Sequence, residues 1–356
     1  MSDLKTSLYE AHVRHGGKMV PFAGWVMPIQ YQGILDEARA VRTGCGLFDV
    51  SHMARGWFRG DRVLDYLSSL VPSDLGRLTD MSAMYTILTN PNGGVIDDII
   101  IYRLSEPEYM VVFNAANREK DLAWFRQHGQ GIDIDDRTLS TAMIAVQGPK
   151  AVETLAALGG TNLPDVPRFA AAETTIAGVR LLAGRTGYTG EDGFELICPA
   201  DQADALWEAL TQEGGVPCGL GARDLLRIEA GLHLYGHELS DEINPIEANL
   251  GWVVHRLEGY WGSKIIARIK AEGPIRKLMG IVMDDRAVPR EGNEIWSDDQ
   301  RIGTVSSGTF SPVLGKSIGM AFIATDYAKA GNRCEMRVRD RAFGASITTR
   351  RFLKDQ

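Results

Sequence analysis

The 356-residue sequence contains few cysteines and no long hydrophobic run. Its cysteines are far apart and include no CxxC pair: Cys45, Cys198, Cys218 and Cys334. This spacing argues against zinc-finger sites and a disulfide scaffold, and it favours a reducing compartment. No segment approaches the roughly 20 apolar residues of a membrane span. The start has no signal-peptide core, because charged residues interrupt it at Asp3, Lys5 and Glu10. We therefore expect a cytoplasmic protein without a membrane partner.

The sequence also lacks an excess of positive charge. The formal net charge is −8, which argues against nucleic acid as a partner. The segment GTFSPVLGKS, residues 308–317, resembles a nucleoside triphosphate loop, but six residues separate its glycines where that loop has four. Glu229, His233 and His237 are spaced to share a helix face around a metal ion. Because Gly231 and Gly236 interrupt that helix, we expect no metal site.

What is present is an ordinary globular composition, with 44% hydrophobic and 24% charged residues. The length predicts two or three domains. Apolar periodicity predicts helices over residues 34–43 and 118–128, a helix that opens at Pro149, and another that Asp201 caps. Strands are expected over residues 85–88, 95–102, 109–114, 142–147, 179–183 and 194–198. From about residue 277, short strands alternate with turns, which predicts a separate C-terminal β domain.

Two adjacent aspartates interrupt an apolar strand in NPNGGVIDDIIIY, residues 90–102. Neighbouring side chains in a strand point to opposite faces, so Asp97 and Asp98 lie on different faces. An ionised carboxylate among apolar groups is costly unless something pairs with it or uses it. Either both aspartates lie in solvent beside the Gly93–Gly94 turn, or one stands at the lip of a cavity to orient or take a proton.

A third candidate is Glu195 in GRTGYTGEDGFEL, residues 184–196. The glycines predict a tight turn that leads into a strand, and Phe194 and Leu196 would face away from Glu195. No GxGxxG pattern is present, so a nucleotide site is disfavoured. The Glu195 carboxylate can receive two N–H donors from the planar edge of a ligand, or it can pair with a neighbouring arginine.

Long ordered blocks of the sequence resemble the aminomethyltransferase, or T-protein, family of the glycine cleavage system. They include GGKMVPFAGWVMPIQY, GLFDVSHM, GGVIDDIIIY, RTGYTGEDGFEL, GLGARDLLRIEAGLHLYG and NPIEANLGW. The resemblance implies an α+β fold, a three-domain cloverleaf. A split α/β folate-binding domain would cover residues 1–52 and 140–245, and an inserted ferredoxin-like domain residues 53–139. A connector, residues 246–274, would lead to a C-terminal β-barrel domain, residues 275–356.

The resemblance also implies a reaction and a set of site residues. Tetrahydrofolate would be the co-substrate and lipoylated H-protein the partner. The products would be ammonia, 5,10-methylenetetrahydrofolate and dihydrolipoyl H-protein. Asp98 matches the catalytic carboxylate beside the folate nitrogens, with Asp97 as its support or the alternative. The positions that match the folate cavity are Glu195, which holds the pterin, with Arg223, Asn114, Tyr85 and Met53.

Two other functions compete with this one. A folate-dependent demethylase of a small methylated compound would share the scaffold and the folate pocket. A non-catalytic folate-binding relative that assists iron–sulfur proteins typically carries a KGCYxGQE-like motif, which this sequence lacks. The sequence departs from the family near its end, where Arg350 to Lys354 contains no proline. Lys354 stands where an arginine or tyrosine is expected to approach the folate tail.

Overall fold

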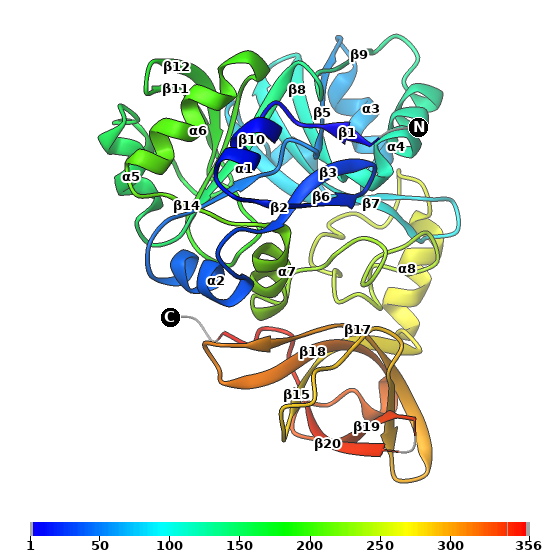
Figure 1. The fold of residues 1–356 in the computed structure, drawn as a ribbon. Coiled ribbons are helices and arrows are strands. Elements are labelled where there is room, and N and C mark those ends of the chain that lie inside the picture. Colours follow the sequence, from blue (N-terminus) through cyan, green and yellow to red (C-terminus); the bar gives the residue numbers. More distant parts are fainter. Residues whose placement is uncertain (1–2, 340, 354–356) are drawn as a thin grey trace. The chain divides into compact units, whose positions relative to one another are not determined.

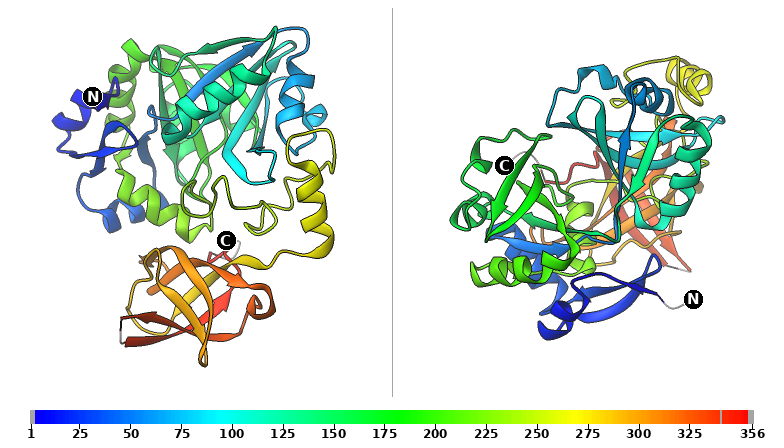
Figure 2. Two further views of the ribbon diagram at one scale, coloured as in Figure 1. Left: turned by 90° about the vertical axis from the view of Figure 1, so that its right-hand side faces the viewer. Right: turned by 90° about the horizontal axis from the view of Figure 1, so that it is seen from above.

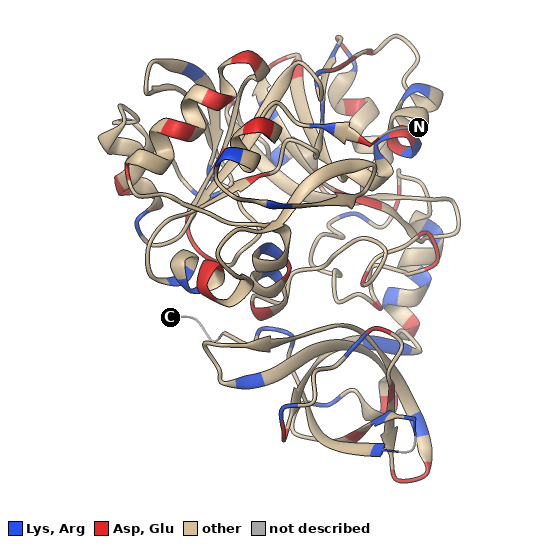
Figure 3. Cartoon of the chain, viewed as in Figure 1, with Lys and Arg blue, Asp and Glu red and all other residues tan. Residues whose placement is uncertain are grey.

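The computed structural model describes residues 3–339 and 341–353 and contains two compact units (Figure 1). The first unit comprises residues 1–67, 75–86 and 99–224, and the second comprises residues 68–74, 87–98 and 225–356. Lys354 lies outside the described residues. Within those residues, no helix has the length and apolarity needed to cross a bilayer. Acidic and basic residues are interspersed along the helices (Figure 3).

A six-stranded sheet organises much of the first unit. Its strand order is β11 (Ala171–Ile176), β12 (Val179–Gly184), β13 (Gly193–Pro199), β10 (Thr141–Gln147), β4 (Gly46–Asp49) and β14 (Val216–Pro217). One face packs against helices α1 (Tyr9–Arg14), α5 (Ala151–Ala157) and α6 (Ala203–Gln212). Phe194, Leu196 and Trp207 are fully buried in this core. The opposite face is therefore left to meet other parts of the unit.

A second, five-stranded sheet has the order β6 (Ser82–Thr89), β7 (Val95–Ser105), β8 (Glu108–Phe113), β5 (Ala54–Arg59) and β9 (Asp133–Asp136). Helix α4 (Arg118–His128) packs against it through Phe125. The centroid of the Phe125 ring lies 4.9 Å from that of Phe58 and 5.7 Å from that of Phe113. Helix α3 (Val63–Leu70) follows β5 in the chain. The remaining sheet of the first unit is three-stranded, in the order β1 (Leu4–Lys5), β3 (Trp25–Gln30) and β2 (Lys18–Phe22).

The second unit contains a closed barrel, visible in Figures 1 and 2. Its strands run in the order β15 (Arg276–Met283), β18 (Lys316–Ala324), β17 (Gln300–Ser311), β16 (Glu294–Ser297), β19 (Arg333–Val338) and β20 (Arg341–Thr348). Side chains such as Ile281, Ile295 and Met336 fill the barrel core. Closure leaves no strand edge open to other chains. The predicted C-terminal β domain is confirmed. Helix α8 (Ser263–Glu272) precedes the barrel.

The predicted helices agree with the structure in two places and differ from it in two others. Helices α2 (Ile34–Thr43) and α4 (Arg118–His128) have the predicted bounds. The helix expected to open at Pro149 begins two residues later, at Ala151. The prediction that Asp201 caps a helix is wrong. Asp201 lies inside the 3₁₀ turn η4 (Ala200–Gln202), and Gln202 precedes α6 without a side-chain cap. There the N–H of Ala203 bonds to the carbonyl of Ala200, so the backbone of the turn supplies the acceptor.

Candidate functional site

Glu195 lies in the middle of β13, on the face of the six-stranded sheet that is turned away from the core. It is paired with Ala145 of β10 and Gly184 of β12. Phe194 and Leu196 enter the core on the other face, as the strand alternation predicted. The Glu195 side chain is nevertheless only 6% exposed. It is therefore a carboxylate held inside the unit, outside the apolar core.

A chain of hydroxyl groups ends on this carboxylate. The hydroxyl of Thr186 donates to Glu195 Oε2 at 2.5 Å, and the hydroxyl of Tyr102 lies 2.8 Å from Thr186 Oγ1. Because the single proton of Thr186 goes to the carboxylate, Tyr102 is the donor in the second bond. In the part of the chain that the structure describes, Glu195 Oε1 has no hydrogen-bond partner and Glu195 forms no ion pair. The alternative of a salt bridge with a neighbouring arginine is therefore not observed.

Arg223 is the cation next to this group, and it comes from α7 (Leu220–Glu229). Its guanidinium lies over the ring of Tyr188 at 4.7 Å, and its Nη1 atom is shielded from solvent without a hydrogen-bond partner among the described residues. Burial raises the pKa of Glu195, while the Thr186 hydrogen bond and the charge of Arg223 act to lower it. Burial likewise lowers the pKa of Arg223, against the charge of Glu195. The pair thus offers an unpaired acceptor and an unpaired donor within one buried region.

The glycines around Glu195 allow other groups to come close. A Cβ on Gly184 would lie 2.6 Å from the hydroxyl of Tyr102, and a Cβ on Gly187 would lie 1.9 Å from Gln147 Oε1. Gln147 in turn holds the loop, since its Nε2 donates to the carbonyl of Thr186 at 3.1 Å. The glycine-rich sequence therefore serves close packing between the loop, β10 and β7.

The paired aspartates lie on β7, an interior strand of the five-stranded sheet. Asp97 is fully buried, whereas Asp98 is half-buried. Asp97 shares its face with Ile99 and Ile101, which are also buried, so the predicted alternation holds. The alternative that both aspartates lie in solvent is wrong for Asp97, because its side chain is fully buried. The assignment of catalysis to Asp98 stays a prediction.

The other predicted wall residues are all half-buried. Met53 follows β4 in the chain, and its carbonyl accepts a hydrogen bond from Arg55. Tyr85 lies on β6, and Asn114 lies between β8 and the turn η2 (Ala115–Asn117). Partial exposure is compatible with lining a pocket, and their contact with folate stays a prediction.

Sequence reasoning missed several groups near Glu195 or near Arg223. Thr186 lies only nine residues before Glu195 in the same block, and its hydroxyl could have indicated a hydrogen-bond donor for the Glu195 carboxylate. Tyr102 shares a strand face with Asp98, but nothing local indicates that it meets Thr186. His52 is 3% exposed, and burial together with the charges of Arg223 and Arg55 lowers its pKa to about 4, with Asp49 opposing. It is therefore a neutral imidazole at physiological pH.

The histidines considered for a metal are separated by the end of α7. The helix stops at Glu229, and Gly231 has a φ of +69°, a conformation that favours glycine. Glu229 accepts a bond from Ser311 at 2.5 Å, and His233 Nε2 lies 2.6 Å from the carbonyl of Ala248. Across residues 3–339 and 341–353, no group of three or more His, Cys, Asp or Glu side chains is arranged to hold a metal ion.

Two family models together match nearly the whole chain. The GCVT N-terminal domain matches residues 8–257, and the glycine cleavage T-protein C-terminal barrel domain matches residues 276–354. The chain belongs to the glycine cleavage T-protein family. Proteins named aminomethyltransferase from Halalkalibacterium halodurans and Synechococcus sp. are each 44% identical to it, over 99% of both sequences. The crystal structure of the glycine cleavage system aminomethyltransferase T from Bartonella henselae superposes with a TM-score of 0.92, at 32% identity and 98% coverage of both chains.

Membership in the T-protein family confirms the predicted α+β fold with its C-terminal barrel. It also confirms the predicted enzyme class, because the two sequence relatives are named aminomethyltransferase and the solved structure is an aminomethyltransferase of the glycine cleavage system. The alternative of a folate-dependent demethylase is not favoured. The chain is thus a transferase, and the open question is which of its side chains bind and activate the substrates.

Proposed function

We propose that this T-protein family member transfers a one-carbon unit from the S-aminomethyldihydrolipoyl arm of H-protein to tetrahydrofolate, and that Glu195 holds the pterin ring. The observation that supports this proposal best is the buried Glu195 carboxylate. Its Oε1 atom has no hydrogen-bond partner among the described residues, and the positive charge of Arg223 is close enough to lower the pKa of Glu195. A pterin presents an N3–H and a 2-amino group side by side. A carboxylate matches that donor pair with its two oxygens, which fixes the orientation of the ring.

The supporting groups suit this role. Thr186 occupies one lone pair of Oε2 and thereby orients the carboxylate, and each carboxylate oxygen has a further lone pair to offer. Glu195 must be ionised to accept both pterin bonds. Since burial disfavours the charge, the Thr186 bond and the Arg223 charge are what favour the ionised form. Met53, Tyr85 and the other proposed wall residue, Asn114, would contact the remainder of the folate.

The catalytic role is proposed for Asp98. The folate N5 and N10 atoms form two bonds to the transferred carbon, while its bonds to the lipoyl sulfur and to the amino nitrogen break. The two protons lost by N5 and N10 appear on the released thiol and ammonia. A carboxylate stabilises positive charge that develops on the carbon or the nitrogen during this exchange. Asp98 is half-buried and so retains access to a substrate, whereas the fully buried Asp97 is proposed to support it.

We further propose three domains, as expected from the sequence: residues 1–52 with 140–245, residues 53–139 and residues 275–356. Lipoylated H-protein is the proposed partner, and its interface would be small and exchangeable because the carrier must leave after each turnover. The reaction as proposed requires no metal, and the proposed compartment is the cytoplasm.

The test is ammonia release from aminomethylated H-protein, measured with and without tetrahydrofolate. We expect ammonia and 5,10-methylenetetrahydrofolate to form in equal amounts, and the rate to fall sharply without folate. A parallel assay offers small methylated amines with tetrahydrofolate. Turnover of the methylated amines without turnover of aminomethylated H-protein would overturn the proposal.

A further inference from the structure

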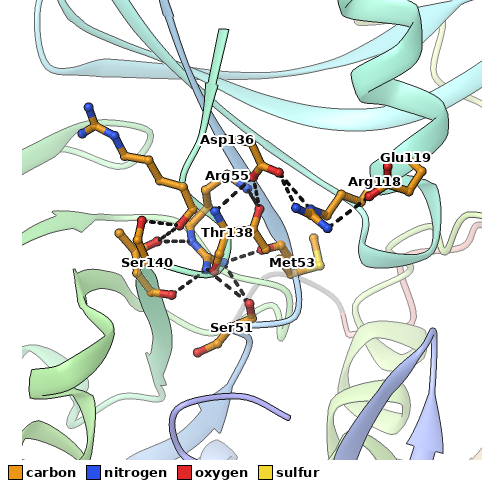
Figure 4. A network of polar contacts seen from close by, with 10 residues as sticks. Ser51, Met53, Arg55, Arg118, Glu119, Asp136, Thr138 and Ser140 are labelled. Carbon is orange, nitrogen blue, oxygen red and sulfur yellow. Dashed lines mark hydrogen bonds and ion pairs between the residues drawn. The ribbon is translucent and has the colours of Figure 1, made fainter. Parts of the chain in front are cut away.

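Arg55 is a fully buried cation at the start of β5, and Figure 4 shows the polar groups around it. Its Nε donates to Thr141 Oγ1 at 2.9 Å. Its two Nη groups donate to the carbonyls of Ser51 at 3.2 Å, Thr138 at 2.7 Å, Thr141 at 2.9 Å, and Met53. Burial lowers the pKa of Arg55 to about 10, so the guanidinium is still charged at neutral pH.

These acceptors belong to Thr141, the first residue of β10, and to two connections that pass between the two large sheets. The first, residues 50–53, leads from β4 of the six-stranded sheet to β5 of the five-stranded sheet. The second, residues 137–140, returns from β9 to β10. One guanidinium therefore binds both chain segments where they cross. Burying a cation costs several kcal/mol, and that cost is offset only when its donors are satisfied in good geometry.

The first connection is fixed from its other side as well. The N–H of Ser51 donates to Asp49 Oδ1 at 2.8 Å, and the N–H of Met143 donates to Ser51 Oγ at 3.0 Å. The N–H of Met53 donates to the carbonyl of Val50 at 3.0 Å. The turn of residues 50–53 is thus held by its own backbone, by a carboxylate and by the planar fork of Arg55. A turn that only links β4 to β5 would need none of these hydrogen bonds.

The geometry points to Arg55 as a positioning residue for tetrahydrofolate, one that acts by fixing the backbone, and hence the side chain, of Met53. This inference rests on the proposed function, in which Met53 lines the folate pocket. Arg55 directs the carbonyls of Ser51 and Met53 toward one point, which sets the direction in which the Met53 side chain leaves the turn. A lysine keeps the charge but has no planar fork, and so it cannot hold two carbonyls in fixed directions.

Arg118 provides a matched control within the same network. It binds Asp136 at 2.5 and 3.0 Å, and Asp136 accepts bonds from the backbone N–H and the hydroxyl of Thr138. Thr138 in turn contacts Arg55. Within the described residues, Arg118 has no bond to the turn of residues 50–53. R118M therefore disturbs the second connection without touching the turn that carries Met53.

The experiment is a double-mutant cycle on tetrahydrofolate affinity, measured by titration calorimetry for wild type, R55K, M53A and R55K/M53A, with R118M as control. Thermal unfolding is recorded for each variant. We expect R55K to bind folate about tenfold more weakly, because a displaced wall residue loses part of its contact. The double variant should bind no more weakly than M53A alone, since the position of a missing side chain has no effect. R118M should change affinity less than twofold.

Additive losses in the cycle, or normal folate affinity in folded R55K, would overturn this inference while the proposed function stands. An equal loss in R118M would also overturn it, because the effect would then belong to the network as a whole. Absence of folate binding by the wild-type protein would instead overturn the proposed function. If R55K fails to fold, T141V replaces it in the cycle, since it removes the hydroxyl that accepts from Arg55 Nε and keeps the cation. The expected result is a smaller loss with the same dependence on Met53.

Discussion

Replacing Glu195 with glutamine tests the proposed folate site most directly. Glutamine has nearly the same shape, and its oxygen can still accept the bond from Thr186. It removes the negative charge, however, and turns one acceptor into an N–H donor that would face a donor of the pterin. E195Q therefore changes the chemistry of recognition with little change in packing.

The magnitude follows from the two bonds at stake. A hydrogen bond to a charged group contributes about 1.5–3 kcal/mol and a neutral one about 0.5–1.5, so the bond that survives loses about 1 kcal/mol. The other bond is replaced by two opposed donors, which costs about 1–3 kcal/mol. The sum, about 2–4 kcal/mol, corresponds to roughly 30- to 700-fold weaker tetrahydrofolate binding.

Stability should change in the opposite sense. Burial raises the pKa of Glu195 in the folded protein, so the carboxyl contributes most to stability when it is protonated. That contribution is lost as the pH rises from the unfolded pKa through the raised folded pKa. Because burial disfavours the charged carboxylate and glutamine carries no charge, the unliganded E195Q protein should unfold at neutral pH at a temperature no lower than wild type.

The assay is titration calorimetry with tetrahydrofolate at neutral pH, together with scanning calorimetry of the unliganded proteins. The matched control is E191Q, because Glu191 lies in the same loop and pairs with Arg42 at 2.8 Å. We expect E191Q to bind folate within twofold of wild type. Wild-type affinity in a folded E195Q protein would remove Glu195 from the folate site and refute the reasoning.

Three further predictions concern catalysis, pH and the barrel. D98N should lower the rate of ammonia release by about two to four orders of magnitude, with little change in folate affinity. D97N should lower the unfolding temperature more than it lowers this rate. Full activity of D98N beside an inactive but folded D97N would mean that Asp97 is the catalytic residue and Asp98 its support. Folate affinity should decrease as the pH falls through the raised pKa of Glu195. In T186V this decrease should begin at a higher pH, because the lost hydrogen bond favoured the ionised form of Glu195. The same dependence of folate affinity on pH in T186V and wild type would contradict the role of Thr186. I281A in the barrel core should lower the free energy of unfolding by about 2–5 kcal/mol in denaturant titrations, whereas an unchanged stability would mean that the cavity is filled by relaxation.

The sequence by itself determined the local elements and the family. Apolar periodicity was sufficient for helices α2 and α4, because a helix that buries one face repeats that face every three to four residues. Strand alternation was sufficient to place Glu195 opposite Phe194 and Leu196, and to separate Asp97 from Asp98. The barrel was predictable as a β domain from its regular turns. Its closure was expected only from the family resemblance.

The tertiary structure alone decided which of these surfaces meet. Strand alternation says which face carries Glu195, but it does not say that Tyr102, on a strand of another sheet, reaches its partner Thr186. The same holds for Arg55, whose acceptors Thr138 and Thr141 lie 83 and 86 residues further along the chain. An arginine at the start of a strand is ordinarily exposed. Here it is buried because backbone carbonyls converge on it from two chain crossings, and such convergence is set by how the sheets pack, which no local pattern encodes.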